Sequence, residues 1–345
     1  MKIIYDDIIY SLQHSGGISL YWSMLETYIN QDIQLLYKNH EKNIFFPTLS
    51  NAKIIKNKNI VFFERFRNIS LQEKLPFVFH SSYYRYCINK NAINITTVHD
   101  FIHEYFRKDI KSILFSIQKK KTIFKSIGLI CNSENTKKDL QKMYPDYKGI
   151  IKVIYLGLSK DYINLNIPRK NNIIFIGGRS GYKNFKYAVK IVQKLNNFIL
   201  QIISGGKLSK KEVMYLQENI PNKFEYYSAL SNKELNIKYN EAKFLLYPSL
   251  YEGFGVPIVE AQAAGCPVVC CNVSSLPEVA GNAAVYISGK NIEEDIEEIN
   301  KLNKKEYYYN VIEKGLENCK RFSWKKCAEE TYNFYKKIYD LYTKK

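Results

Sequence analysis

Hydrophobic positions alternate along the chain between short apolar runs and longer segments with helical spacing. The short runs are too brief for helices, so each predicts a buried strand. In the first half these runs are residues 2–5, 61–63, 77–79, 95–98, 129–132 and 152–155. In the second half they are residues 173–176, 198–203, 223–226, 244–247 and 267–271. This alternation predicts an α/β fold, with parallel sheets covered by helices on both faces.

The polar segment 159–172, which contains Pro168, is the best candidate for a linker between two doubly wound halves. A length of 345 residues fits two domains at about 150 residues each. We therefore expect one domain over residues 1–165 and a second over residues 166–323. The tail, residues 324–345, is aromatic and predicts a terminal helix.

Residues 244–271 carry the clearest local pattern, a strand, a glycine-containing loop, a helix and a second strand. Pro257 fits the first turn of the helix, where its missing N–H has no cost. Gly265 is expected to end the helix, and Pro267 prevents it from resuming. Open α/β sheets bind ligands in loops of this kind, between a strand and the helix that follows it.

Two acids, Glu252 and Glu260, flank the junction between this loop and its helix. Helix N-terminal amides attract phosphate, and carboxylates can accept hydrogen bonds from hydroxyls. The combination predicts a site for a nucleotide that carries a sugar. The alternative is a plain βαβ unit in which Glu252 is solvated and Glu260 is salt-bridged.

A second pattern follows the strand at 173–176, where Gly177 and Gly178 precede two cations, Arg179 and Lys183. Arginine offers a planar fork of donors and lysine a compact charge, which suits a diphosphate. The alternative is that both are ordinary surface cations in a lysine-rich chain.

Two weaker patterns lie in the first half. Gly16 and Gly17 follow the first strand, either as a ligand-binding loop or as a plain tight turn. His99 and Asp100 follow the strand at 95–98, either as a catalytic dyad or with Asp100 capping the next helix.

The frame P-S-x-x-E-G-F-G-x-P-x-x-E-A occupies residues 248–261. On this frame the chain resembles family 4 of the retaining glycosyltransferases, which have the GT-B fold. The resemblance implies two Rossmann-like domains facing a cleft, with the acceptor in the N-terminal domain and the nucleotide sugar in the C-terminal one. It also implies that residues 324–345 cross back to the N-terminal domain.

The resemblance assigns roles to particular side chains. Arg179 and Lys183 would contact the donor pyrophosphate, Glu260 the ribose hydroxyls, and Glu252 and His99 the donor sugar. The implied catalytic residues are His99, Arg179, Lys183 and Glu252. The implied donor-binding residues are Gly16, Gly17, Gly178, Gly253, Phe254, Gly255 and Glu260. The resemblance also suggests that the acceptor cleft is lined by His80, Ser82 and Tyr83.

The expected activity is transfer of a hexose from a nucleotide-diphosphate sugar to a hydroxyl of a glycan or lipid-linked acceptor, with retention. Similarity to polysaccharide-building relatives favours a GDP-mannose-like donor, with a UDP-sugar next. The sequence has no Asp-x-Asp motif, so we expect neither a metal nor a cofactor besides the donor. A sugar-nucleotide epimerase and a non-catalytic nucleotide-sugar or glycan-binding protein remain as alternatives.

A formal charge of +18 suits anionic partners, such as nucleotide diphosphates or acidic membranes. No nucleic-acid-binding motif is visible, so nucleic acid is not an expected partner. Residues 106–127 predict a basic helix that either lies on a membrane surface or packs one face on its sheet. The odd number of cysteines, seven, predicts buried thiols in a reducing cytoplasm. No apolar run is long enough for a transmembrane helix, and no signal-peptide pattern opens the chain.

Overall fold

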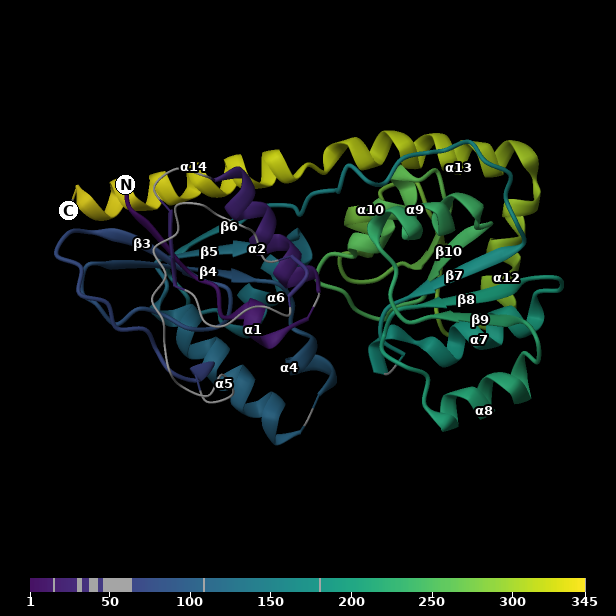
Figure 1. Cartoon of the computed structure of the whole chain (residues 1–345), viewed down its shortest axis with the longest axis horizontal. Coiled ribbons are helices and arrows are strands. Elements are labelled where there is room, and N and C mark those ends of the chain that lie inside the picture. The colour runs from purple at the N-terminus through teal and green to yellow at the C-terminus, as the bar shows by residue number, and fades with distance from the viewer. Residues whose placement is uncertain are drawn as a thin grey trace. The chain divides into compact units, whose positions relative to one another are not determined.

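The computed structural model describes residues 1–14, 16–29, 33–36, 43–45, 64–107, 109–179 and 181–344. The chain divides into two compact units, of which unit 1 comprises Met1–Gly157 and Ser323–Lys345, and unit 2 comprises Leu158–Phe322. Within the described residues, each unit has one six-stranded sheet (Figure 1). All strands pair in parallel. The predicted fold class is therefore confirmed.

The sheet of unit 1 has the order β2-β1-β3-β4-β5-β6. Its strands are β1 Ile3–Asp6, β2 Ile33–Leu36, β3 Phe77–Ser81, β4 Ala92–Val98, β5 Gly128–Cys131 and β6 Ile150–Val153. Its helices are α1 Ile9–Leu12, α2 Gly17–Tyr28, α4 Ile102–Phe106, α5 Ile110–Lys125, α6 Glu134–Met143 and α14 Trp324–Thr343. The strand order reverses at β1, because β2 is added on one side of it and β3 to β6 follow on the other. In doubly wound sheets, ligands bind outside the carboxyl ends of the strands at such a reversal.

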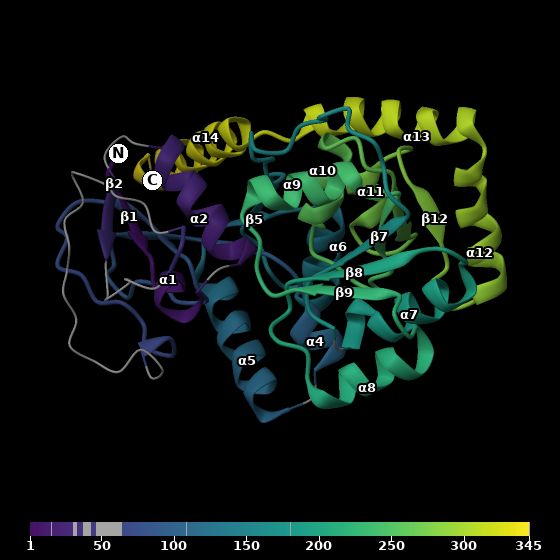
Figure 2. The same ribbon diagram turned by 45° about the vertical axis from the view of Figure 1, so that its right-hand side comes forward.

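The C-terminal helix α14 is part of unit 1, where it packs on α2, β3 and β4. In Figures 1 and 2, α2 and α14 lie on one side of this sheet and α5 on the other. Buried hydrogen bonds join the helix to the strands, because the hydroxyl of Tyr335 lies 2.6 Å from Nδ1 of His80 and 3.2 Å from the hydroxyl of Tyr5. Gly157 lies so close to this helix that a Cβ on it would come within 2.1 Å of the Trp324 nitrogen.

The sheet of unit 2 has the order β12-β11-β10-β7-β8-β9. Its strands are β7 Asn172–Ile176, β8 Ile199–Ile203, β9 Phe224–Tyr227, β10 Phe244–Tyr247, β11 Val268–Cys271 and β12 Val285–Ile287. Its α-helices are α7 Phe185–Lys194, α8 Lys210–Asn219, α9 Asn232–Glu241, α10 Val256–Ala263, α11 Leu276–Ala280, α12 Ile292–Asn300 and α13 Lys305–Asn318. Helices α7 and α8 lie on one side of the sheet, and α9, α10 and α13 on the other (Figure 2). The reversal of strand order falls between β7 and β10.

The predicted linker, residues 159–172, is bonded to unit 2. The backbone nitrogen of Ile163 donates to Oδ1 of Asn236 at 3.1 Å, and that of Leu165 donates to Oδ1 of Asn240 at 2.7 Å. The guanidinium of Arg169 donates to the carbonyl oxygens of Tyr239, Asn240, Ala242 and Gly265. These bonds explain why the division between the units follows Gly157, ahead of the expected boundary after residue 165.

The local expectations for residues 244–271 are confirmed. Strands β10 and β11 flank α10, which has Pro257 in its first turn. Gly265 has a φ of +68°, a left-handed conformation that ends helices. The predicted strand at 61–63 lies outside the described residues. All seven cysteines are buried with free thiols. No described helix combines the length and apolar character needed to cross a bilayer.

Candidate functional site

Lys183 and Glu252 meet at the strand-order reversal of unit 2. Lys183 follows β7 and Glu252 follows β10, and these adjacent strands bring their loops to the same edge of the sheet. Nζ of Lys183 lies 2.6 Å from Oε1 of Glu252, and it donates to the hydroxyl of Tyr247 at 3.0 Å. The side chains of Lys183 and Glu252 are 15% and 10% exposed, so the ion pair is largely shielded from water.

Two serines hold the loop that carries Glu252. Oγ of Ser275 donates to the carbonyl oxygens of Glu252 and Phe254, at 2.9 Å each. Oγ of Ser274 accepts from the backbone nitrogen of Glu252 at 3.0 Å. Gly255 has a φ of +102°, which disfavours any side chain at this turn. The loop is therefore fixed by the residues that precede α11, a role that the sequence did not reveal.

Phe254 stands within the predicted donor-binding loop, but its side chain belongs to the core of unit 2. Phe254 is 4% exposed, and its ring packs edge-to-face on that of Phe322, with the ring centroids 5.5 Å apart. Any contact of Phe254 with a donor would therefore be made by its backbone. Of the neighbouring glycines, Gly253 is buried, whereas Gly178, across the strand-order reversal, is exposed.

Arg179 is directed to a different loop from Lys183. Its Nε donates to Oε1 of Glu212 at 2.8 Å, and Nη1 donates to the carbonyl oxygen of Ser204 at 2.9 Å. Nη2 donates to the carbonyl oxygens of Gly206 and Lys207, at 2.9 and 3.0 Å. Four of the five guanidinium donors are thus in use. In this conformation the structure brings Lys183 to Glu252 and keeps Arg179 on the loop after β8.

Glu260 lies on α10, where two tyrosines face its carboxyl group. The hydroxyl of Tyr239 donates to Oε2 of Glu260 at 3.2 Å. Burial raises the pKa of Glu260 to about 7, although the hydrogen bonds from Tyr239 and Tyr162 act in the opposite direction. Glu260 therefore changes its charge near neutral pH. Neither tyrosine was predicted as part of the site.

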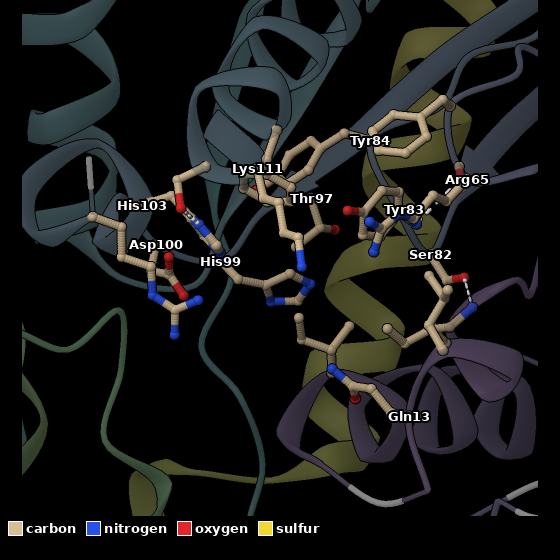
Figure 3. Close-up of a pocket in the computed structure, with 18 of the residues that line it drawn as sticks. Gln13, Arg65, Ser82, Tyr83, Tyr84, Thr97, His99, Asp100, His103 and Lys111 are labelled. Carbon is tan, nitrogen blue, oxygen red and sulfur yellow. Dashed lines mark hydrogen bonds between the residues drawn. The ribbon is translucent and has the colours of Figure 1, made fainter. Parts of the chain in front are cut away.

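A pocket of about 1030 Å³ lies within unit 1, at the carboxyl ends of its central strands. Ser82 and Tyr83 from the end of β3, and His99 from the end of β4, line one part of it. Arg107 and Lys111, beside the start of α5, line another. In Figure 3 the side chains of His99 and Lys111 point into the same space. The pocket therefore combines hydroxyl, imidazole and cationic groups.

His99 is a neutral imidazole at physiological pH. Burial is the main cause, and it lowers the pKa of His99 to about 4. Asp100 raises this pKa and Lys119 lowers it, both by smaller amounts.

The segment beyond β4 is held on both sides. Oδ1 of Asp100 accepts from the backbone nitrogen of Ile102 at 3.0 Å, a local turn just ahead of α4, whose N-cap residue is Phe101. The buried ammonium of Lys119 donates to the carbonyl oxygen of Asp100 and, at 3.2 Å, to Oε2 of Glu104.

His80 does not line this pocket, so its suggested place in the acceptor cleft is wrong. The side chain is fully buried in β3, with Nδ1 bonded to Tyr335 at 2.6 Å and Nε2 to Thr97 at 3.0 Å. Burial lowers its pKa to about 3. His80 therefore joins α14 to the sheet, whereas Ser82 and Tyr83 do reach the pocket.

Gly16 and Gly17 lie at the start of α2. Gly17 is its first residue, and a Cβ there would meet no atom within 4 Å. Gly16 has a φ of 167°, an extended conformation open to any residue. Both remain predicted donor contacts through the N-terminal amides of this helix. Among the residues that the structure describes, no group of three His, Cys, Asp or Glu side chains could hold a metal ion.

Residues 160–320 match the family described as glycosyl transferases group 1. This range covers nearly all of unit 2, from its first segment to the last turn before Phe322. Unit 2 is a glycosyltransferase group 1 domain. Its matched range includes the ion pair of Lys183 and Glu252, the Arg179 loop and Glu260.

Comparison with individual proteins also finds glycosyltransferases among the relatives of this chain. The chain is 38% identical to the O-antigen chain mannosyltransferase B of Escherichia coli over 112 residues, which are 32% of this chain and 29% of that protein. It is 26% identical to an uncharacterized glycosyltransferase of Methanocaldococcus jannaschii, over 99% of both chains. The chain thus matches less than a third of the first relative and almost all of the second.

The fold of the whole chain has solved counterparts. Sucrose-phosphate synthase from Thermosynechococcus elongatus aligns with a TM-score of 0.77 and 14% identity, over 99% of this chain and 100% of that one. At this identity the likeness concerns the fold. The chain therefore has the GT-B fold, and its group 1 domain accompanies a partial resemblance to a mannosyltransferase.

Proposed function

We propose that the protein transfers a hexose from a nucleotide-diphosphate sugar to a hydroxyl of a glycan or lipid-linked acceptor, with retention of configuration. The observation that carries this proposal is the shielded pair of Lys183 and Glu252 at the strand-order reversal of a group 1 domain. Such a reversal is where doubly wound sheets bind nucleotides. Glu260 on the adjoining helix supplies a second carboxylate for hydroxyl groups.

Lys183 is assigned to the donor diphosphate. Among the described residues, two of its three N–H groups donate to the protein, one to Glu252 and one to Tyr247. The third is directed by these two bonds, so the ammonium is held in place before the ligand binds. A fixed cation stabilises negative charge that develops on the leaving diphosphate.

Glu252 is assigned to the donor sugar and Glu260 to the ribose. Ser274 and Ser275 fix the position of Glu252, and the two tyrosines fix that of Glu260. A carboxylate accepts hydrogen bonds from sugar hydroxyls and donates none. The backbone of Gly253, Phe254 and Gly255, before α10, and Gly178 on the other side are assigned to the phosphates.

Arg179 is the second proposed diphosphate ligand, and it has to exchange partners to act as one. Its bonds to Glu212 and to the carbonyls of residues 204, 206 and 207 would break or be shared when the donor binds. Donor binding would then release the loop after β8. The alternative consistent with these bonds is that Arg179 positions this loop and leaves the diphosphate to Lys183.

The proposed transfer needs no protein nucleophile. The acceptor hydroxyl attacks the anomeric carbon from the face that the diphosphate leaves, the glycosidic bond to the phosphate breaks, and the departing phosphate takes the hydroxyl proton. His99 is neutral, so it can hydrogen-bond to the donor sugar without competing for the diphosphate charge. Gly16 and Gly17, at the N-terminus of α2, are assigned to the donor through their backbone amides. Lysine and backbone amides neutralise the leaving group, so the reaction is proposed to be metal-independent.

The preferred donor is a GDP-mannose-like sugar nucleotide, with a UDP-sugar second. This preference is supported by similarity to 112 residues of the Escherichia coli mannosyltransferase, which are 29% of that protein. We place the reaction in the cytoplasm, with peripheral contact between unit 1 and an anionic membrane. The pocket of unit 1 is the proposed acceptor site.

The test measures release of nucleotide diphosphate from candidate donors, and the sugar product, for Lys183→Ala and Glu252→Ala. Each variant should lose transfer by at least about 100-fold while the protein stays folded. The matched controls are Lys194→Ala and Glu293→Ala, which remove an exposed ion pair of the same unit. Near wild-type turnover in either site variant would remove that residue from the proposal. Release of an isomerised sugar nucleotide without an acceptor would identify an epimerase, and binding without turnover a non-catalytic protein.

A further inference from the structure

Helix α5 presents a row of large apolar side chains to the outside of unit 1. Ile110 is 76% exposed, Ile117 59%, Ile113 52% and Leu114 50%. With about 100° of rotation per residue, these four positions fall within an arc of about 100° on the helix. Phe124, 44% exposed, extends the row by two further turns. We call these five residues the apolar row of α5.

The opposite side of α5 already packs on unit 1. Ser112, Lys119, Thr122 and Ile123 are its buried residues. The interpretation that the helix packs one face on its sheet is therefore correct for this side. It does not explain the other side, because a solvated helix face is normally polar. An exposed cluster of large apolar groups indicates a surface that meets something apolar.

The charges on α5 itself are all of one sign, and the acid Asp109 beside its first residue is engaged as the N-cap of the helix. The helix sequence IKSILFSIQKKKTIFK has five lysines and no acidic residue. Lys119 is the buried one, and Lys111, Lys120, Lys121 and Lys125 are exposed. Lys120 and Lys125 fall on either side of the row and Lys121 within it, by the same rotation per residue. Long lysine stems can follow apolar side chains into an interface while their ammonium groups stay in water.

We propose that α5 docks on the surface of an anionic lipid bilayer. The helix lies in the interfacial plane, with the apolar row among the acyl chains and the four lysines at the level of the headgroups. An apolar face bordered by cations is the arrangement that binds anionic membranes. The bilayer is the occupant that matches both properties of the face, because a nucleic acid has no apolar surface to receive the isoleucines.

The docked helix also contributes to the pocket of unit 1. Ile110, the first residue of the apolar row, also lines the pocket, together with Lys111 beside it and Arg107. A bilayer under α5 therefore lies at the edge of the proposed acceptor site. If the proposed function holds, the acceptor is a glycan attached to a membrane lipid through phosphate, with Arg107 and Lys111 facing the phosphate.

The test is co-flotation of the full chain with two kinds of phosphatidylcholine vesicle. One contains about 30 mol% phosphatidylglycerol as the anionic lipid, and the other contains none. We expect binding to the anionic vesicles, weakened by about 5-fold for each exposed lysine changed to glutamine, and reduced in high salt. The variant Ile113→Glu/Ile117→Glu should bind at least about 100-fold more weakly. Its matched control, Met214→Glu/Ile237→Glu, alters exposed apolar residues on α8 and α9 of unit 2 and should bind like the wild type.

Absence of binding to anionic vesicles, or equal binding of the α5 variant and its control, overturns the proposal. Binding that survives Ile113→Glu/Ile117→Glu but is lost with heparin also overturns it, because the contact would then be charge alone. Far-UV circular dichroism and thermal melting show that both double variants fold. None of these measurements requires a donor or acceptor, so failure of the proposed function leaves the result on α5 unchanged.

Discussion

The ion pair of Lys183 and Glu252 makes a quantitative prediction about stability that is separate from catalysis. Its atoms lie 2.6 Å apart, and both side chains are largely shielded from water. Replacing one partner leaves the other charge with little solvent, so Lys183→Met and Glu252→Gln should each lower the free energy of unfolding by about 3 kcal/mol. The double variant should lose no more than either single one, which corresponds to a coupling energy of about 3 kcal/mol.

The measurement is a double-mutant cycle by urea denaturation in the absence of nucleotide. Lys194 and Glu293 supply the control cycle, because their side chains are 55% and 73% exposed and their atoms 3.1 Å apart. An exposed pair of this kind should couple by less than about 0.5 kcal/mol. If the two cycles give equal coupling energies, the site pair is not electrostatically shielded, and the reasoning that a preorganised ammonium awaits the diphosphate is refuted.

Three further predictions concern other residues of the two units. Because burial raises the pKa of Glu260 to about 7, donor affinity in titration calorimetry should fall as the pH drops below 7, by up to about tenfold per unit. Glu260→Gln should remove this pH dependence. His80→Leu should lower the free energy of unfolding by about 2 kcal/mol, through loss of its buried bonds, and His99→Ala should instead lower turnover in a protein of nearly unchanged stability. Gly205→Ala should cost about 2 kcal/mol in denaturant unfolding, because its Cβ would lie 2.3 Å from the carbonyl oxygen of Gly177, whereas Gly178→Ala has open space.

The parts of the fold that the sequence predicted are those with strong local signals. Strands β10 and β11 are continuous apolar runs, and Pro257 and Gly265 mark the ends of the helix between them. Strands β2 and β12 were not predicted. β12 has three residues, and β2 contains a glutamine within a short run. Runs of this size become strands only through pairing with β11 and β1.

The candidate site was predicted only in part, for a related reason. Glu252 and Lys183 stand in recognisable patterns after strands, so their approach could be expected from parallel topology. The serines before α11 and the tyrosines at Glu260 have no such pattern, and only tertiary contacts place them. His80 illustrates the opposite case, because its position at the end of β3 suggested a ligand contact. The burial of that strand end beneath α14 turns the side chain into a structural link.

The most direct test of the donor site is a crystal structure of the protein soaked with a nucleotide-diphosphate sugar such as GDP-mannose. The diphosphate should lie against the ammonium of Lys183, with the ribose hydroxyls at Glu260 and no cation between phosphate and protein. A nucleotide bound away from the β7 and β10 loops, or held through a magnesium ion, would contradict this assignment.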